Sequence, residues 1–323
     1  MPIGPRVDAI HTMASHENFP VIFDGEHYDI KKFLRDHPGG VNTLNLYKGK
    51  SIVDAMKKFE HSTGAYHIMK DFKVSGDEAN VLIRDVNLTG DVSGRLDWSK
   101  PLLCQLDAIA PHYDTWVNTP VYKKCRIFAS PLLEGLTYTP WYVVPIFWIP
   151  IILYLGITQF MQLVAFFMGY EVQGILLWTA IEYILHRWVF HLNPGSSLTM
   201  IKIHFLFHGL HHKVPFDGLR QVFPPVPALF LATIIYNLIL PFMRYPEMKL
   251  MGALIGYLIY DMIHYYVHHG SPRDGTYLYE MKRYHSNHHF INHDKAFGIS
   301  SKLWDYVFKT IVNVKRLGFS LRW

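Results

Sequence analysis

Histidine is concentrated in one part of this 323-residue chain, where thirteen of its twenty copies lie between His186 and His293. They form four short clusters, H-R-W-V-F-H, H-F-L-F-H-G-L-H-H, H-Y-Y-V-H-H and H-S-N-H-H, each beside or between long apolar segments. Imidazole is a common ligand of iron, zinc and copper. Because one metal ion takes roughly three to six ligands, ten or more histidines predict two metal ions.

The spacing indicates which nitrogens can converge. Residues four apart share one face of a helix, and three sets have this spacing: His204, His208 and His212; His264 and His268; His285 and His289. His211 and His288 follow three residues after His208 and His285, on an adjoining part of that face. His186 and His191 are five apart, roughly 140° around an ideal helix, so we expect a bent or frayed helix end there.

We therefore expect ten metal-binding, catalytic histidines: His186, His191, His208, His211, His212, His264, His268, His285, His288 and His289. For His204, His269 and His293 we expect packing, orienting or solvent roles. Glu182, Asp261 and Asn292 are candidates to fix the imidazole tautomers. Ligand type alone does not choose among iron, zinc and copper. Since no cysteine accompanies the clusters, a structural zinc finger is disfavoured.

A second histidine pair lies near the N-terminus. His37 begins H-P-G-G, and His61 follows 24 residues later in F-E-H-S-T-G. The proline and two glycines predict a tight turn that a planar macrocycle can approach closely. Two axial histidines would fill both open positions on a haem iron, which predicts single-electron transfer. Apolar residues expected to line this pocket are Phe33, Leu34, Val41, Leu44, Leu46, Ile52, Val53, Met56 and Phe59.

Four apolar segments surround the main clusters: Trp141–Leu155, Ile157–Leu185, Val222–Phe242 and Leu250–Tyr266. We interpret them as about four membrane crossings, with tilt or local thinning for the short ones. An even number of crossings places every cluster on the side of the N-terminal region, which we expect to be cytosolic. Nine cations, among them Arg187, Lys213, Arg220 and Lys282, share that side, whereas Arg244 and Lys249 lie opposite, as the positive-inside rule requires.

Composition supports a membrane protein. Half the residues are hydrophobic and 18% are charged, against about 25% in globular domains. The net charge of +5 is spread along the chain, so no nucleic-acid partner is expected. Two cysteines without a CxxC motif fit a reducing compartment, and the first 15 residues contain no signal-peptide core. We expect a haem-binding domain at 1–75 with a hairpin in Phe19–Ile30, a packed connector at 76–130, and a membrane domain at 131–323.

The stretch Phe19–Val74 resembles cytochrome b5, with His37 and His61 at the two haem-ligand positions. Nearly the whole chain resembles the fatty acid 2-hydroxylases, on these motifs: L-D-W-S-K-P-L-L, L-L-E-G-L-T-Y-T-P-W-Y, E-Y-I-L-H-R-W-V-F-H, H-F-L-F-H-G-L-H-H and K-R-Y-H-S-N-H-H. The resemblance implies a mainly α fold, in which a multi-pass membrane domain with a histidine-rich dimetal cytosolic cap joins a small α+β cytochrome b5-like domain. It also implies the ten histidines named above as the ligands of two metal ions.

The implied reaction is 2-hydroxylation of long fatty acyl chains for 2-hydroxysphingolipid synthesis in the endoplasmic reticulum membrane. The implied cofactors are haem b and two metal ions, iron in the active enzyme with zinc as an alternative in isolated protein. Dioxygen is the co-substrate, and electrons come from NADPH or NADH through a cytochrome reductase, because no GxGxxG dinucleotide fingerprint is evident. We expect the acyl tail to lie among apolar helices, with Trp178, Trp188, Phe205 and Phe207 along its path.

Three alternatives remain at this point. An acyl or sterol desaturase, or a C4-type hydroxylase of the same superfamily, would share the histidine boxes. A membrane zinc transporter would use a histidine-rich surface but needs no haem, so the H-P-G-G and His61 pair disfavours it. A membrane-anchored haem electron donor would have a second domain without catalytic function.

Overall fold

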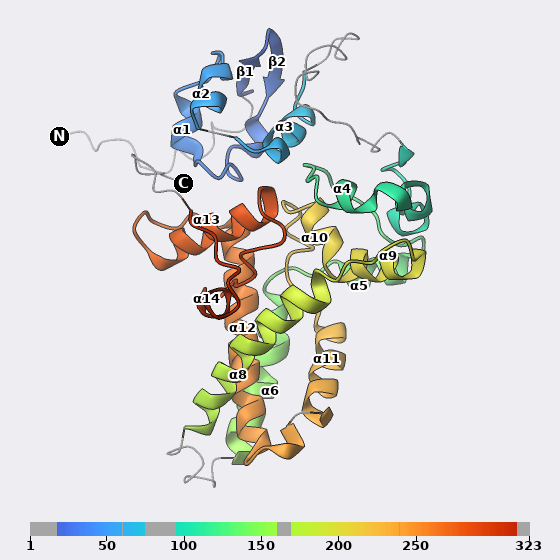
Figure 1. The fold of residues 1–323 in the computed structure, drawn as a ribbon, viewed down its shortest axis with the longest axis vertical. Helices are drawn as coiled ribbons and strands as arrows, with labels where there is room; N and C mark the ends of the chain where they lie inside the picture. Colours follow the sequence, from blue (N-terminus) through green and yellow to red (C-terminus); the bar gives the residue numbers. More distant parts are fainter. Residues whose placement is uncertain (1–17, 60, 75–94, 160–168, 239, 315–323) are drawn as a thin grey trace, which may run out of the picture.

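The computed structural model describes residues 18–314, apart from 60, 75–94, 160–168 and 239. It is mainly helical and elongated. Figure 1 shows long helices at one end, a cap of shorter helices in the middle, and a small N-terminal module at the other end. The cap therefore lies between the module and the long helices.

The N-terminal module is built on an antiparallel hairpin of β1 (Pro20–Phe23) and β2 (Glu26–Asp29), in which Val21 pairs with Tyr28. Asp24 and Gly25 both have positive φ, 50° and 81°, as the tight turns of two-residue hairpins require. The two predicted strands are thus confirmed. Three helices complete the module: α1 (Val41–Asn45), α2 (Val53–Lys58) and α3 (Thr63–Lys70). They share an apolar core with the hairpin, in which Val21 is fully buried.

The described part of the connector, from residue 95 onward, is a packed strap. It contains short 3₁₀ turns at Leu102–Cys104 and Leu106–His112, followed by α4 (Tyr113–Val117). Its apolar side chains are buried against α9 (Leu198–His204), so that Trp116 and Leu106 share one core with Ile201 and Phe205. This core attaches the strap to the histidine-bearing part of the chain, as expected for a connector with aromatic anchors.

Four helices run along the long axis: α6 (Val143–Gln159), α8 (Tyr170–Ile184), α11 (Pro225–Leu238) and α12 (Pro246–His269). The first runs four residues beyond the expected Leu155. The second begins at Tyr170 rather than Ile157, because Gly169 adopts a left-handed conformation with φ +68°. The intervening 160–168 lie outside the described residues. By length and composition, Pro225–Phe242 and α12 are able to cross a membrane, while α6 is shorter at 17 residues.

Glycines bring α8 and α12 into close contact. A Cβ atom on Gly174 would lie 2.2 Å from the carbonyl oxygen of Lys249, and one on Gly252 would lie 1.9 Å from that of Glu171. Helices approach this closely only where side chains are absent, as is common in membrane proteins. The outward sides of the bundle are apolar: Ile157 on α6 is 75% exposed and Phe230 on α11 is 69% exposed. Such a surface is suited to lipid.

The cap consists of α5 (Pro131–Thr137), α9, α10 (Leu210–Lys213), α13 (Tyr277–Phe290) and α14 (Leu303–Val307). Figure 1 places α13 directly beneath the N-terminal module and above the end of α12. This arrangement brings all the histidine clusters to one end of the bundle.

Candidate metal centre and haem site

The ten histidines selected from the sequence form two groups of five. The first group comprises His186, His191, His208, His212 and His288, and the second comprises His211, His264, His268, His285 and His289. Within each group one ring nitrogen of every histidine lies within 4.8 Å of all the others. Each group thus draws on three or four separate segments of the chain.

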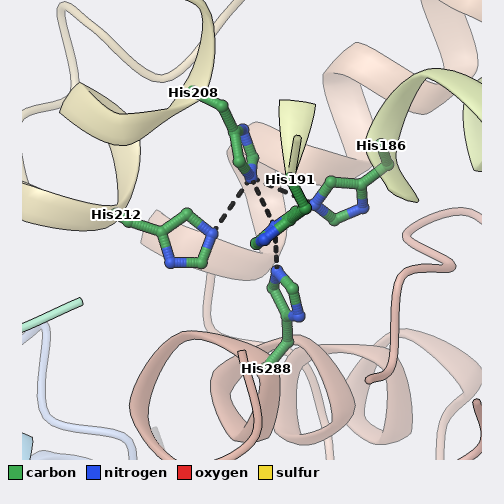
Figure 2. A group of neighbouring side chains, drawn as sticks. All are labelled: His186, His191, His208, His212 and His288. Carbon is green, nitrogen blue, oxygen red and sulfur yellow. Dashed lines mark hydrogen bonds between the residues drawn. The ribbon is translucent and has the colours of Figure 1, made fainter. Parts of the chain in front are cut away.

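In the first group the Nε2 atoms point toward a common centre (Figure 2). The Nε2 of His208 lies 3.1 Å from those of His186 and His191 and 3.0 Å from that of His212, and the Nε2 of His191 lies 3.0 Å from that of His288. A neutral imidazole has a single N–H donor and a single acceptor. Five converging nitrogens therefore cannot all hydrogen-bond to one another, whereas a central cation would accept all five lone pairs.

In the second group His285 is central. Its Nε2 lies 2.9 Å from that of His268, 3.0 Å from that of His289 and 3.1 Å from that of His264. His211 completes the group, 3.0 Å from the Nε2 of His264. The two groups adjoin, since the sequence neighbours His211 and His212 belong to different groups. The donor sets fit two neighbouring metal ions.

Burial keeps these rings neutral. It lowers the pKa of His186 to about 3 and holds the pKa of His208 and His288 well below the ordinary value, and neighbouring histidines lower the last two further. A neutral imidazole is the form that binds metal. The electrostatics therefore suit ligands rather than cationic surface histidines.

Two π-helical turns change the directions in which the histidine side chains point, compared with an ideal α-helix. Leu185–Phe190 forms one such turn, in which the amide of His191 bonds to the carbonyl of His186 at 3.1 Å. A π-turn joins residue i to i+5, so His186 and His191 face the same way, and the expected distortion is found. Phe205–Gly209 forms the second. It separates His204 from His208 and His212, which an ideal helix would have aligned with it.

His204, His269 and His293, for which roles other than metal binding were expected, all lie outside both groups. His204 shares a 2.7 Å hydrogen bond with the Tyr113 hydroxyl of the connector. His269 packs beside Tyr265 with ring centroids 4.9 Å apart, and His293 lies 5.8 Å from the ring of His212. The sequence had not indicated Tyr113 as a partner for His204. No short-range pattern joins residues 91 positions apart.

For His186 and His288 the orienting partners are backbone carbonyls rather than the expected side chains. His186 Nδ1 donates to the carbonyl of Phe297 at 2.5 Å, and His288 Nδ1 donates to that of Lys295 at 2.7 Å. These bonds leave both Nε2 atoms free to bind metal. The loop 295–300 thus sets the tautomers of two first-group rings.

The expectation for Glu182, Asp261 and Asn292 was wrong in detail, because their side chains bond elsewhere; of the three, only the Asn292 backbone bonds an imidazole, that of His288. The Glu182 carboxylate accepts from the Ile299 and Ser300 amides at 2.9 and 2.8 Å and from the Ser300 hydroxyl. Asp261 accepts from the Phe223 amide, and Asn292 donates to Asn287. Glu182 still matters, since it holds the loop that orients His186.

A second carboxylate, Asp305, holds the same loop and was missed from the sequence. It is fully buried and accepts from the amides of Phe297 at 3.0 Å and Gly298 at 2.8 Å, and from the Thr310 hydroxyl at 2.7 Å. Its only sequence signal is an acidic residue in an otherwise apolar turn. That signal is too common to indicate a role.

The N-terminal histidines face a cavity of about 350 Å³. The rings of His37 and His61 are nearly parallel, at 25°, with centroids 6.1 Å apart. A Cβ on Gly39 would lie 2.6 Å from the His37 ring, and Gly40 has φ +77°, which explains both glycines of H-P-G-G. Burial lowers the pKa of His37 to about 3 and lowers that of His61, whose Nδ1 donates to the Met56 carbonyl at 3.1 Å. Two neutral rings flanking an apolar slot fit a bis-histidine haem.

The predicted lining of this cavity was partly right. Phe33, Leu44, Ile52, Met56 and Phe59 line it. Leu34, Val41, Leu46 and Val53 are not among the described lining residues, and Leu46 is 67% exposed. The unexpected part of the wall comes from α13, about 230 residues later, which contributes Phe290 among others.

A smaller cavity of about 70 Å³ lies within the bundle, lined by residues of α6, α8, α11 and α12. Phe190 lines it and also stacks on His208, with ring centroids 5.4 Å apart. Of the aromatics expected along an acyl path, only Trp178 is among its described walls. Phe205 is buried in the connector core, and Trp188 packs on Phe308. Phe205 and Trp188, which were expected along the acyl path, are thus packing residues.

Two family models match this chain. The fatty acid hydroxylase model covers residues 171–310, and the cytochrome b5-like heme/steroid binding domain model covers 9–77. The human fatty acid 2-hydroxylase is 38% identical over 89% of this chain and 90% of its own length. The chain belongs to the fatty acid 2-hydroxylase family.

Further relatives agree. The dihydroceramide fatty acyl 2-hydroxylase of Arabidopsis thaliana is 39% identical over 68% of this chain and 94% of that protein. A solved structure described as full-length Scs7p, with only its hydroxylase domain visible, superposes with a TM-score of 0.60 at 33% identity. It covers 68% of this chain and 86% of that chain. These matches imply a haem in the N-terminal module, iron bound by the histidine clusters, and association with a membrane.

The family motif L-L-E-G-L-T-Y-T-P-W-Y has a structural explanation in this chain. Arg220, whose side chain is 1% exposed, pairs with Glu134 at 2.5 Å, bonds the Thr137 hydroxyl at 2.7 Å and lies over the Tyr138 ring at 4.2 Å. Glu134 in turn accepts from the Ile127 amide at 2.9 Å. The motif therefore ties the connector to the segment that follows the second histidine box.

Proposed function

We propose that this chain is a membrane monooxygenase that places a hydroxyl group on C2 of long fatty acyl chains used for 2-hydroxysphingolipids. The observation that carries the proposal is the pair of adjoining five-histidine groups beside an apolar cavity in the helical bundle. The names of the relatives, fatty acid 2-hydroxylase and dihydroceramide fatty acyl 2-hydroxylase, support the substrate class and the position.

We assign the ten histidines as ligands of two iron ions, with zinc as a substitute in isolated protein. When bound, the iron pair supplies the oxygen-activating chemistry that an unactivated C–H bond requires. The protein side chains hold the site: burial excludes water, and the loop 295–300 fixes the tautomers of His186 and His288 through its carbonyls. Phe190 separates the first group from the apolar cavity and limits which carbon of a bound chain comes close to it.

Part of the acyl tail lies in the bundle cavity, whose walls include Trp178, Phe223 and Tyr257, and the rest of a long chain extends beyond it along the apolar helices. The polar head stays at the cytosolic surface, so that the carbon next to it is held near the histidines. His37 and His61 would hold haem b, which would supply single-electron transfer when bound. The electrons would come from NADPH or NADH through a reductase.

We propose four membrane crossings in the endoplasmic reticulum, with both sites facing the cytosol. The common end of the histidines and the N-terminal module supports an even number of crossings. Two of the cations counted on the cytosolic side, Lys213 and Lys282, have a structural role instead. Lys213 and Lys282 are buried, and their ammonium groups donate to backbone carbonyls of Trp116 and Gly270, so they stabilise the fold. The division into 1–75, 76–130 and 131–323 remains our proposal for the domain boundaries.

The test is product analysis with membranes that contain the full chain. Supplied with a labelled long-chain acid or its ceramide, ¹⁸O₂ and NADPH with reductase, they should yield 2-hydroxy product carrying one ¹⁸O. The His285→Ala variant should yield none. An unsaturated product without 2-hydroxy acid would instead establish a desaturase, and metal flux without product would establish a transporter.

A further inference from the structure

Helix α13 has two faces with different neighbours. Its histidines, His285, His288 and His289, point into the two metal-binding groups and are buried. Four other residues of α13 line the N-terminal cavity: Arg283, Ser286, Asn287 and Phe290. The spacing of these four is i, i+3, i+4 and i+7, which defines one helical stripe. At 100° per residue that stripe lies about 155° from the mean direction of the histidines.

The cavity and the metal-binding groups are therefore separated by a single helix, a thickness on the order of 10–12 Å with its side chains. His289 of the second group and Phe290 of the cavity lining are adjacent in sequence and about 100° apart around this helix, with ring centroids 6.1 Å apart. In the described structure α13 is the element that contributes both to a histidine group and to the cavity lining on opposite faces.

The N-terminal module is held in place mainly by Tyr122 of the connector and also touches α13. The Tyr122 hydroxyl donates to Asp36, next to His37, at 3.0 Å and lies 3.0 Å from the Lys32 carbonyl. The Tyr122 amide donates to Asp71 at 2.8 Å, and its ring lies 4.9 Å from that of Phe72. A Cβ on Gly64 of α3 would lie 3.4 Å from the Phe290 ring of α13, in ordinary van der Waals contact, and 3.2 Å from Pro120 of the connector. These contacts place the open side of the cavity against α13.

We propose that α13 is a shared wall, whose outer face completes the haem site and whose inner face carries the metal ligands. Electrons then cross this helix within one chain. The inference rests on the proposed function for the direction of electron flow. It also goes beyond the solved relative, in which only the hydroxylase domain is visible.

The electron balance is that of a monooxygenase. One O₂, two electrons and two protons are consumed for each substrate hydroxylated, with one oxygen atom going to the product and the other to water. A haem held by His37 and His61 would pass these two electrons one at a time, and a flavin-containing reductase that oxidises NADPH or NADH would supply each of them.

The test places an aromatic ring into the cavity from the α13 side. Ser286→Phe is made in the full-length chain, with Glu280→Phe as its control, since Glu280 lies on the same helix with its side chain 62% exposed. Metal content, haem retention and the rate of haem reoxidation by O₂ after pre-reduction are measured, with His285→Ala defining the autoxidation baseline. We expect Ser286→Phe to keep both metals and to change haem retention or reoxidation at least tenfold, and Glu280→Phe to change neither.

A second variant protects the test against misfolding near the histidines. Tyr122→Ala loosens the module far from the metal ligands and should slow reoxidation at least threefold with haem content unchanged, whereas the exposed Tyr142→Ala should not. Wild-type rates after Ser286→Phe and Tyr122→Ala, or equal changes in their controls, would overturn the proposal. The readout is the haem spectrum, which does not depend on which product the enzyme makes. A desaturase would therefore give the same haem result, so a failure of this proposal can be told from a failure of the proposed function.

Discussion

His212 and His289 stack on each other, with ring centroids 4.3 Å apart and planes inclined by 23°. They belong to different five-histidine groups. This contact makes the two groups one continuous centre, as a reaction that needs two neighbouring metal ions requires. Because each histidine belongs to only one of the two groups, replacing it should weaken the binding of one metal ion.

Replacing two adjacent histidines at the end of α12, His268 and His269, should have different effects on metal content. His268 belongs to the second group, with its Nε2 2.9 Å from that of His285, whereas His269 belongs to neither group. His268→Ala should lower metal content from two ions per chain toward one and abolish product. His269→Ala should keep two ions. Elemental analysis of both purified variants checks this, and equal losses would contradict the grouping.

The carboxylate of Asp305 should control the first group without touching it. Asp305→Asn replaces one acceptor oxygen by a donor beside the amides of Phe297 and Gly298, so the loop that bonds His186 is released. Partners of this kind typically contribute about 10–100-fold to metal affinity. Titration with metal should show one weakened site of two, while the exposed Asp274→Asn should titrate like wild type. Equal weakening of both sites would indicate general unfolding.

The chemistry of the site was easier to predict than its geometry. All ten histidines and the haem pair followed from residue type and spacing, because imidazole has few other reasons to cluster. Their division into two groups did not follow, since it depends on π-helical turns at Leu185–Phe190 and Phe205–Gly209. A single extra residue in a turn rotates every later side chain by about 100°, and no residue type marks it.

The orienting contacts were hidden for a different reason. The Nδ1 partners of His186 and His288 are backbone carbonyls, which every residue has, so sequence cannot single them out. The shared wall of α13 was not predicted, because the helical spacing of Arg283, Ser286, Asn287 and Phe290 does not indicate what that face contacts. Only the docked N-terminal module reveals it.

The crossing of α8 and α12 predicts a sharp contrast between two glycines. In Gly252→Ala the new methyl group would lie 1.9 Å from the Glu171 carbonyl oxygen, so the helices must separate. Overpacking of this kind typically costs about 1–3 kcal/mol. Gly135→Ala in α5 meets nothing within 4 Å, and should be neutral or stabilise by up to about 1 kcal/mol. Thermal unfolding in detergent measures both, and equal midpoints for the two variants would contradict the close packing.

Acidification should destabilise the haem-free full-length protein through His37. Burial lowers the pKa of His37 from 6.5 to about 3 in the folded state. Below about pH 6.5 the unfolded chain therefore binds a proton at this residue that the folded chain does not. As the pH is lowered from 6.5 to 3, the free energy of unfolding therefore decreases by about 1.4 kcal/mol per pH unit because of this residue. Its contribution is constant above that window.

The variant His37→Leu removes this titrating group from the cavity and should make the pH dependence shallower by that same slope. Chemical unfolding of the haem-free variant and wild type, at several values between pH 6.5 and 4.5, measures the difference. In the haem-loaded protein the same protonation competes with iron for Nε2, so the Soret band of wild type should decline over this range. Parallel pH profiles for the two haem-free proteins would mean that His37 is accessible to protons in the folded state.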